Sequence, residues 1–292
     1  MKGLLRCGIF ICSLSTISSA QAIIEIPFTL DESAVPIATL NINGQDGEFM
    51  LDTGSQYAFH FTQQFMRQVP WLKRQKEKSR STDLTGEVYI NDRFMFHHVS
   101  VNGMSFENAE GVSLAPWGLT LMPDGKRPEH MVIGLGLFQQ KALMIDYPRS
   151  LFSVAHQLSE FNIDANQWLS LPLTVGHEGI VIEVMNNDNT YKMVLDTGAT
   201  ISMMWKKRVN EPPNNIACIE VMAELDNDRC EALQLHIKNA TPGDFNVEAI
   251  LLEGDFTHME TDGLVGQNFL QQHIVIIDFP NNQMLFRSIE ES

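Results

Sequence analysis

The stretch Phe49–Ser55 reads Phe-Met-Leu-Asp-Thr-Gly-Ser, and Met193–Ala199 reads Met-Val-Leu-Asp-Thr-Gly-Ala. In both stretches the apolar run predicts a buried strand, and the glycine permits a sharp turn directly after it. One chance Asp-Thr-Gly in a chain of this length has a probability of roughly 5%. Two copies with the same flanks therefore indicate an internal repeat, with an aspartate at the end of a core strand in each half.

Two further pairs of segments match in the same order. Val132–Gly134 (Val-Ile-Gly) corresponds to Leu264–Gly266 (Leu-Val-Gly), and Met144–Pro148 (Met-Ile-Asp-Tyr-Pro) corresponds to Ile276–Pro280 (Ile-Ile-Asp-Phe-Pro). A solenoid would need at least three repeats. Two copies therefore favour a pair of duplicated lobes.

The segments between these motifs are short and typical of strands. Residues such as Ile37–Ile42 and Glu48–Leu51 are β-branched or aromatic and are separated by turn dipeptides such as Asn43-Gly44. We therefore expect an all-β protein. The polar stretch 155–170 suits a linker, which predicts a first lobe over 23–160 and a second over 161–292.

The composition is that of a globular protein. The chain has 292 residues, of which 44% are hydrophobic and 19% charged, and 20 Lys and Arg oppose 36 Asp and Glu for a formal charge of −16. This charge repels phosphate backbones, so a nucleic-acid partner is excluded. No apolar run after the N-terminus reaches the length of about 18 residues that a spanning helix requires, so no integral membrane segment is expected.

The first residues have the three parts of a secretory signal. Lys2 and Arg6 precede the apolar stretch Cys7–Leu14, and small residues follow up to Ala22. A buried first strand or helix is the alternative, but this cluster of small polar residues would pack poorly. We expect residues 1–22 to be a signal peptide and the mature protein to be secreted or periplasmic.

Cys218 and Cys230 remain after the signal, an even count in an exported chain, which favours a disulfide. It would close a loop of about a dozen residues, worth roughly 3 kcal/mol. The alternatives are a metal pair or two free thiols, but no Cys-x-x-Cys or His-rich partner accompanies these residues. We expect no metal site.

The two repeated aspartates carry the chemistry. If the lobes are related by an approximate two-fold axis, Asp52 and Asp196 can meet at the interface. Two carboxyls in contact do not both ionise; they share one proton and titrate as a coupled pair. The ionised carboxylate can then take a proton from water while the protonated one hydrogen-bonds a scissile carbonyl oxygen. Such a site needs no cofactor.

The sequence resembles the aspartic peptidases of the pepsin and retropepsin type, specifically at the two Asp-Thr-Gly segments and at Val132–Gly134 and Leu264–Gly266. The resemblance implies a bilobal pepsin-like acid protease fold, with two homologous β-barrel-like lobes and an active-site cleft between them. It also implies supporting roles for six neighbours of the aspartates: Thr53, Gly54, Ser55, Thr197, Gly198 and Ala199.

In that family the two threonines hydrogen-bond across the interface, and the two glycines point backbone N–H groups at the carboxyls. Ser55 matches the position whose hydroxyl supports the first aspartate, whereas Ala199 has no hydroxyl. The resemblance therefore implies two inequivalent acids, and we expect more ionised character on Asp52.

Such enzymes cover their cleft with a β-hairpin flap, and Thr82–Tyr89 lies in about the right place. Gly86 could form its tip and Tyr89 could face the substrate, although a plain surface hairpin is an equal alternative. The disulfide in the second half would pin a hairpin there and leave the first as the moving lid.

One helix is expected over 62–79, interrupted at Pro70. The basic cluster in its second part is interpreted as a solvated face rather than a docking site.

These observations predict an exported aspartic endopeptidase that acts on peptides or unfolded proteins as a monomer. The alternative is a non-catalytic peptide- or inhibitor-binding protein with the same fold.

Overall fold

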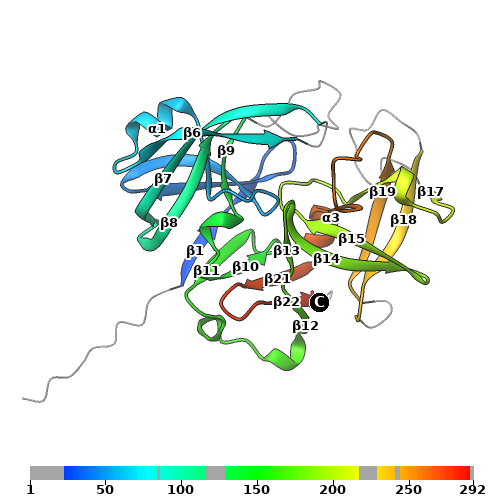
Figure 1. Ribbon diagram of the computed structural model, residues 1–292. Coiled ribbons are helices and arrows are strands. Elements are labelled where there is room, and N and C mark those ends of the chain that lie inside the picture. The colour runs from blue at the N-terminus through cyan, green and yellow to red at the C-terminus, as the bar shows by residue number, and fades with distance from the viewer. Residues whose placement is uncertain (1–22, 84–85, 116–128, 217–228, 241–243, 290–292) are drawn as a thin grey trace, which may run out of the picture.

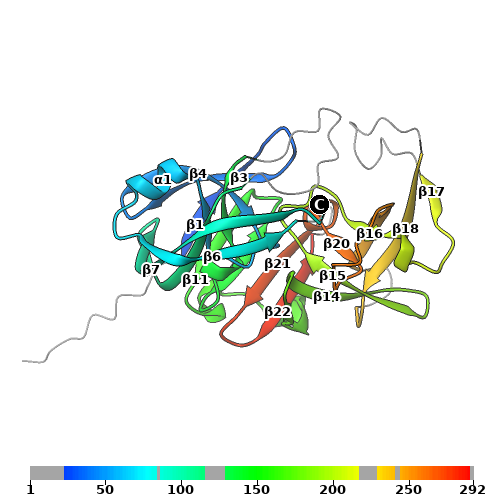
Figure 2. The ribbon, with the colours of Figure 1, turned by 45° about the horizontal axis from the view of Figure 1, so that its top comes forward.

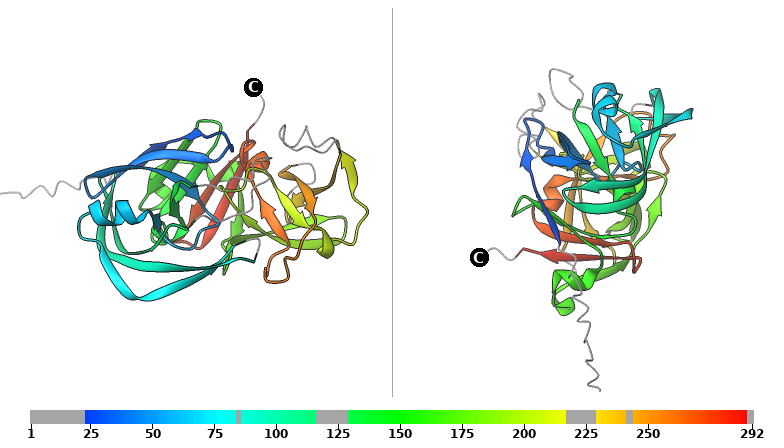
Figure 3. Two further views of the ribbon diagram at one scale, coloured as in Figure 1. Left: turned by 90° about the horizontal axis from the view of Figure 1, so that it is seen from above. Right: turned by 90° about the vertical axis from the view of Figure 1, so that its left-hand side faces the viewer.

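The structure is a computed structural model that describes residues 23–83, 86–115, 129–216, 229–240 and 244–289. Strands dominate these residues, as predicted, and form two eight-stranded sheets and one six-stranded sheet. In Figure 1 the two larger sheets lie on opposite sides of the molecule, with the six-stranded sheet between and below them. The view from above in Figure 3 shows the same two lobes side by side.

The first eight-stranded sheet comes from the first half of the chain. Its strands, in spatial order, are β2 (Thr29–Leu30), β3 (Pro36–Ile42), β4 (Gln45–Asp52), β9 (Met131–Gly134), β5 (Phe59–Phe61), β8 (Met104–Ser113), β7 (Val88–Val101) and β6 (Lys73–Thr82). An additional pairing of Ile42 with Val101 joins β3 to β7 and closes the sheet on itself. Buried phenylalanines fill its interior; Phe61, for example, stacks on Phe94 with ring centroids 5.1 Å apart.

The second eight-stranded sheet repeats this order position by position. Its strands are β13 (Val175–Gly176), β14 (Gly179–Asn186), β15 (Asn189–Leu195), β20 (Gly263–Val265), β16 (Met203–Trp205), β19 (Asn246–Leu252), β18 (Cys230–Ile237) and β17 (Asn214–Ile216). Pairing of Val184 with Ile237 joins β14 to β18, which closes this sheet in the same way. The internal repeat seen in the sequence is thus a repeat of topology.

The six-stranded sheet draws strands from both halves. Its order is β1 (Ile24–Pro27), β11 (Leu151–Ala155), β10 (Ala142–Asp146), β21 (His273–Asp278), β22 (Gln283–Ser288) and β12 (Leu169–Pro172). The halves meet where β10 pairs antiparallel with β21, Ala142 lying opposite Asp278. The main buried apolar cluster likewise contains residues of both halves. The lobe boundary at residue 160 stays a prediction.

Short helical segments occupy the connections. They are α1 (Gln63–Gln68), η1 (Leu135–Leu137), η2 (Leu158–Phe161), η3 (Ala165–Gln167), η4 (Lys206–Arg208) and α3 (Gln267–Leu270).

Two parallel pairings position the repeated aspartates. β4 runs parallel to β9 with Asp52 opposite Gly134, and β15 runs parallel to β20 with Leu195 opposite Val265. Each Asp-Thr-Gly turn therefore emerges beside the apolar segment that ends in glycine in its own half. The two motifs of each repeat, far apart in sequence, are neighbours in the sheet.

The predicted helix over 62–79 is wrong in its second part. Thr62 caps α1 by accepting the N–H of Phe65 at 3.2 Å, and the helix ends at Gln68, before Pro70. Residues Lys73–Thr82 form β6, which lies at the edge of its sheet and pairs with β7 (Figure 2). Its basic side chains are exposed, and charged residues are typical of edge strands because they prevent pairing with other chains.

The predicted signal peptide, residues 1–22, lies outside the described residues. Within the described ranges, no helix has the length and apolar composition that crossing a bilayer requires.

Candidate active site

Asp52 and Asp196 stand at the ends of equivalent strands, β4 and β15. Asp52 is only 3% exposed, and its Oδ1 accepts the N–H of Gly54 at 2.7 Å. Asp196 is more accessible, and its Oδ1 accepts the N–H of Gly198 at 2.8 Å. Each turn therefore holds its own carboxyl with the N–H of the glycine two residues later.

The two turns meet face to face. A Cβ atom on Gly54 would lie 2.9 Å from the carboxyl group of Asp196, and one on Gly198 would lie 3.2 Å from that of Asp52. No side chain fits at the first of these positions without displacing the opposite aspartate. The glycines are thus required by close approach, and the approach brings the two carboxyl groups into hydrogen-bonding contact.

Burial and mutual repulsion set the acidity of the pair. Desolvation, followed by the charge of Asp196, holds the pKa of Asp52 well above its usual value. Desolvation also raises the pKa of Asp196, but the N–H groups of Gly198, Gly54 and Ala199 favour its charged form. The expectation that Asp52 is the more ionised acid stays a prediction. The greater exposure of Asp196 and the N–H groups around it favour the charge on that member instead.

Thr53 and Thr197 hydrogen-bond across the interface in a reciprocal pattern. The hydroxyl of Thr53 donates to Leu195 O at 2.8 Å and accepts the N–H of Thr197 at 3.0 Å. The hydroxyl of Thr197 donates to Leu51 O at 2.7 Å and accepts the N–H of Thr53 at 2.9 Å. Four buried bonds thus join the two turns beneath the carboxyls.

Tyr147 is a neighbour of the site that the sequence reasoning missed. Its buried hydroxyl donates to Thr197 O at 3.2 Å, and desolvation raises its pKa far above the usual value. In the repeat its counterpart is Phe279, which has no hydroxyl. Tyr147 therefore ties the six-stranded sheet to the second turn alone, and a residue-by-residue comparison of the two copies would have singled it out.

Two solved structures are similar to the chain over most of its length. An aspartic proteinase from Irpex lacteus matches 92% of this chain and 98% of its own, with a TM-score of 0.55 and 13% sequence identity. Basic 7S globulin from soybean matches 91% of this chain and 94% of its own, with a TM-score of 0.58 and 10% identity. The chain has the pepsin-like aspartic peptidase fold.

The predicted bilobal all-β fold class is confirmed by these matches. At such low identity the likeness concerns the fold and not the activity. No protein-family model matches the chain, and no curated protein sequence matches it.

Ser55 has a different partner from the one that the resemblance implied. Among the described residues, its hydroxyl lies 2.7 Å from Nε2 of His60 rather than bonding to Asp52. His60 belongs to β5, lines the same cavity as Asp52, and has its pKa lowered to about 4 by burial. Sequence reasoning did not single out His60.

The β6–β7 hairpin of this pepsin-like fold lies beside the cavity that both aspartates line. Gly86 has a positive φ of 85°, and its N–H donates to Asp83 O at 3.0 Å. The hydroxyl of Tyr89 donates to the carboxylate of Asp83 at 3.2 Å. Nε2 of His258, from the second half, lies 3.2 Å from Asp83 O. The hairpin therefore contacts the opposite lobe, whereas its role as a flap stays a prediction.

A cavity of about 340 Å³ lies between these parts. Its walls include both aspartates, Ser81 and Tyr89 of the hairpin, and Glu178 of the turn between β13 and β14. The site is thus built from both lobes, with the carboxyl pair on its lining.

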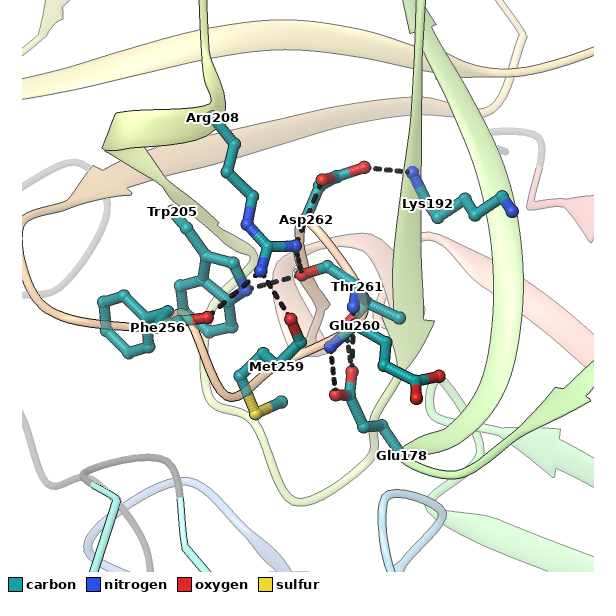
Figure 4. A network of polar contacts seen from close by, with 9 residues as sticks. All are labelled: Glu178, Lys192, Trp205, Arg208, Phe256, Met259, Glu260, Thr261 and Asp262. Atoms are coloured by element: carbon teal, nitrogen blue, oxygen red, sulfur yellow. Dashed lines mark hydrogen bonds and ion pairs between the residues drawn. The ribbon is translucent and has the colours of Figure 1, made fainter.

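A polar network fixes the wall on the side of the second lobe (Figure 4). Arg208 donates to three backbone carbonyl oxygens, those of Phe256, Met259 and Thr261. The carboxylate of Glu178 accepts the hydroxyl and the N–H of Thr261 from the other side. Met259 and Glu178 both line the cavity, so this network holds part of the site in place.

The remaining site predictions concern cysteines and metals. Cys230 lies in β18, but Cys218 lies outside the described residues, so their disulfide stays a prediction. No group of three or more His, Cys, Asp and Glu side chains placed to hold a metal ion is found in the described part of the chain.

Proposed function

We propose that the protein is an aspartic endopeptidase that hydrolyses peptide bonds with water activated between Asp52 and Asp196. The observation that supports this most strongly is the close approach of the two carboxyl groups: a Cβ atom on Gly198 would lie 3.2 Å from both, and both line the cavity. A protein without catalytic use for such a pair would carry two desolvated, mutually repelling acids at a cost in stability.

The two acids take different parts in the proposed reaction. Asp196, the better stabilised carboxylate, removes a proton from a water molecule, and the oxygen of that water attacks the peptide carbonyl carbon. Asp52, protonated, donates its proton to the carbonyl oxygen, which gives a neutral tetrahedral diol. Asp196 then gives its proton to the leaving nitrogen while Asp52 takes a proton from one diol hydroxyl, so that the C–N bond breaks and a carboxylic acid and an amine leave. No covalent bond to the protein and no cofactor are needed.

An extended peptide fits the proposed site best. It would lie between the β6–β7 hairpin and the two Asp-Thr-Gly turns, with alternate side chains toward opposite walls. Ser81, Tyr89 and Glu178 line those walls. The hairpin would act as the flap and would have to open for entry, since Asp83 contacts His258 of the second half.

Export and a monomeric state are part of the proposal. The signal pattern of residues 1–22 supports transfer to the periplasm or the medium. Both acids come from one chain, so a dimer is not needed to complete the site.

The proposal is tested by digesting a denatured protein with the mature chain across acid to neutral pH, with and without a statine-type transition-state analogue. We expect cleavage with a bell-shaped pH dependence, because one acid must be ionised and the other protonated. The analogue should abolish cleavage. Tight peptide binding with no product at any pH would instead identify the binding protein considered as the alternative.

The raised pKa values also predict an effect on stability. A carboxyl whose pKa is higher in the folded than in the unfolded protein binds its proton more tightly in the folded state. The free energy of unfolding therefore falls as pH rises from the unfolded pKa toward the folded pKa. Each unit by which the folded pKa exceeds the unfolded pKa lowers the free energy of unfolding at neutral pH by about 1.4 kcal/mol. Asp52→Asn should therefore unfold at higher urea concentration than wild type at pH 7, and the difference should vanish near pH 3. A variant that is less stable than wild type at pH 7 would contradict this.

A further inference from the structure

The β6–β7 hairpin has two faces of different chemistry. Successive side chains of a strand point to opposite faces of its sheet. On β6 the Ser79 hydroxyl lies 2.6 Å from that of Tyr57, and Ser81 lines the cavity. Lys78 and Arg80, which alternate with these serines, therefore point away from the cavity, toward the outside of the molecule.

The outward face of the hairpin continues on β7 with apolar side chains. Arg80 lies opposite Ile90, and Thr82 lies opposite Val88, so each pair shares one face of the sheet. Ile90 is 66% exposed and Val88 is 42% exposed. The face that points away from the cavity is thus both cationic and apolar.

Positive charge is concentrated on β6. Five of its ten residues are Lys or Arg and one is acidic, in a chain whose formal charge is −16. Asp92 pairs with two of the cations, Arg74 and Lys78. In the described part of the chain the other three have no ion-pair partner: Lys73, Lys76 and Arg80. Protection of a sheet edge requires no exposed apolar residues, so it does not explain this surface.

Trp71, two residues before β6, is turned outward by its own backbone. Its φ of 62° lies in a region that bulky residues rarely adopt, and its side chain is 74% exposed. The residues around it are anchored: Val69 is buried, Leu72 packs on the main apolar cluster, and Pro70 O accepts a hydrogen bond from Asn43 at 3.1 Å. The chain thus keeps a strained residue that holds an indole ring in solvent, which indicates a use for that ring.

We propose that this side of the hairpin docks on an anionic lipid bilayer. The docking surface consists of Trp71, Lys73, Lys76, Arg80, Val88 and Ile90. Its cations would meet lipid phosphates, while its apolar side chains enter the interfacial layer, where tryptophan is favoured. Docking leaves the opposite face of the hairpin free toward the cavity. The inference goes beyond the proposed function and does not depend on it.

The negative charge of the whole chain does not prevent such docking. At physiological salt, charges act over only about 8 Å, so the cations of β6 dominate the field at their own surface. The acidic remainder of the protein instead orients the molecule with the docking surface toward the bilayer. A soluble polyanion is the other partner that this charge would fit, but it would make no use of the exposed apolar side chains of Trp71, Val88 and Ile90.

The test measures flotation of the mature chain, residues 23–292, with vesicles of phosphatidylcholine alone or mixed equally with phosphatidylglycerol. We expect binding to the anionic vesicles only, and its loss in about 0.5 M salt. Lys76→Gln/Arg80→Gln should bind about thirtyfold more weakly, since each cation near an anionic surface contributes about 1 kcal/mol. Lys192→Gln/Lys207→Gln is the control, because it removes the same charge from exposed positions of the second half and should bind like wild type.

Trp71→Asn/Ile90→Thr tests the apolar part of the docking surface. Asparagine accepts a positive φ and threonine keeps the β-branched shape, so the hairpin should keep its fold. We expect this variant to bind the anionic vesicles about tenfold more weakly, because less apolar surface leaves water.

Three outcomes would overturn the inference. One is equal binding to both kinds of vesicle, and another is a charge variant that binds as tightly as its control. The third is an apolar variant that binds like wild type, since the surface would then recognise charge alone, as for a soluble polyanion. All substituted residues are exposed, so urea midpoints should match wild type; if a double variant unfolds earlier, its two single variants decide by the same criteria. Peptide hydrolysis does not enter these measurements, so failure of the proposed function is distinguishable from failure of this inference.

Discussion

Asp52→Asn and Asp196→Asn are each expected to lower kcat/KM for peptide hydrolysis by about 10³–10⁴-fold, the upper range for loss of general acid–base catalysis. Asparagine has nearly the shape of aspartate and can still accept the N–H of Gly54 or Gly198. It can neither carry the shared proton nor take one from water. The loss should therefore appear in kcat, while the fold and the cavity persist. Single-turnover cleavage of a fluorogenic peptide measures it.

Asp146→Asn is the matched control for these variants. Asp146 is as buried as Asp52 and belongs to the same repeat, but its carboxylate accepts the N–H of Arg149 at the turn after β10 and does not line the cavity. Its substitution should leave kcat/KM within about twofold of wild type, since no acid of the pair is changed. Equal activity of Asp52→Asn and Asp146→Asn would exclude the proposed mechanism.

Thr197→Val should lower the stability of the folded protein strongly. Valine keeps the shape of threonine but leaves Leu51 O and the N–H of Thr53 without their partner, in a place where Thr197 is fully buried. Each unpaired buried group costs about 1–3 kcal/mol, so the free energy of unfolding should fall by about 2–6 kcal/mol. Urea denaturation at one fixed pH measures the difference.

Thr197→Ser is the control because serine keeps the hydroxyl and loses only a methyl group. It should cost less than half as much as valine. Thr53→Val removes the mirror-image bonds to Leu195 O and the N–H of Thr197, so its cost should be similar to that of Thr197→Val. If serine and valine at residue 197 destabilise equally, packing rather than hydrogen bonding holds the two turns together.

The repeat allowed much of the fold to be predicted from sequence. An apolar run followed by Asp-Thr-Gly predicts a buried strand that ends in a sharp turn. The two copies therefore predicted where β4 and β15 end. The apolar segments before Gly134 and Gly266 supplied their parallel neighbours, β9 and β20. The meeting of the two halves also follows from the sequence, because a duplicated unit tends to assemble about a two-fold axis.

What could not be predicted depends on contacts between segments distant in sequence. The charged stretch Lys73–Thr82 has no apolar period, and only its place at the sheet edge makes it a strand. The balance of charge between the two acids depends on contacts across the interface, because the Gly54 N–H also favours the charge on Asp196, in the opposite turn. The partner of Ser55, His60, becomes visible only when β5 is placed beside the turn.

The shared sheet also has a consequence for the order of folding. The chain is synthesised from its N-terminus, so the first lobe is complete before residues 273–278 are made. Until then the edge of β10 that pairs with β21 has unpaired backbone groups. Such an edge can recruit a strand from another molecule. The nascent chain is therefore most prone to associate with other copies of itself between the synthesis of β10 and that of β21. A shorter interval should give a higher yield of folded protein.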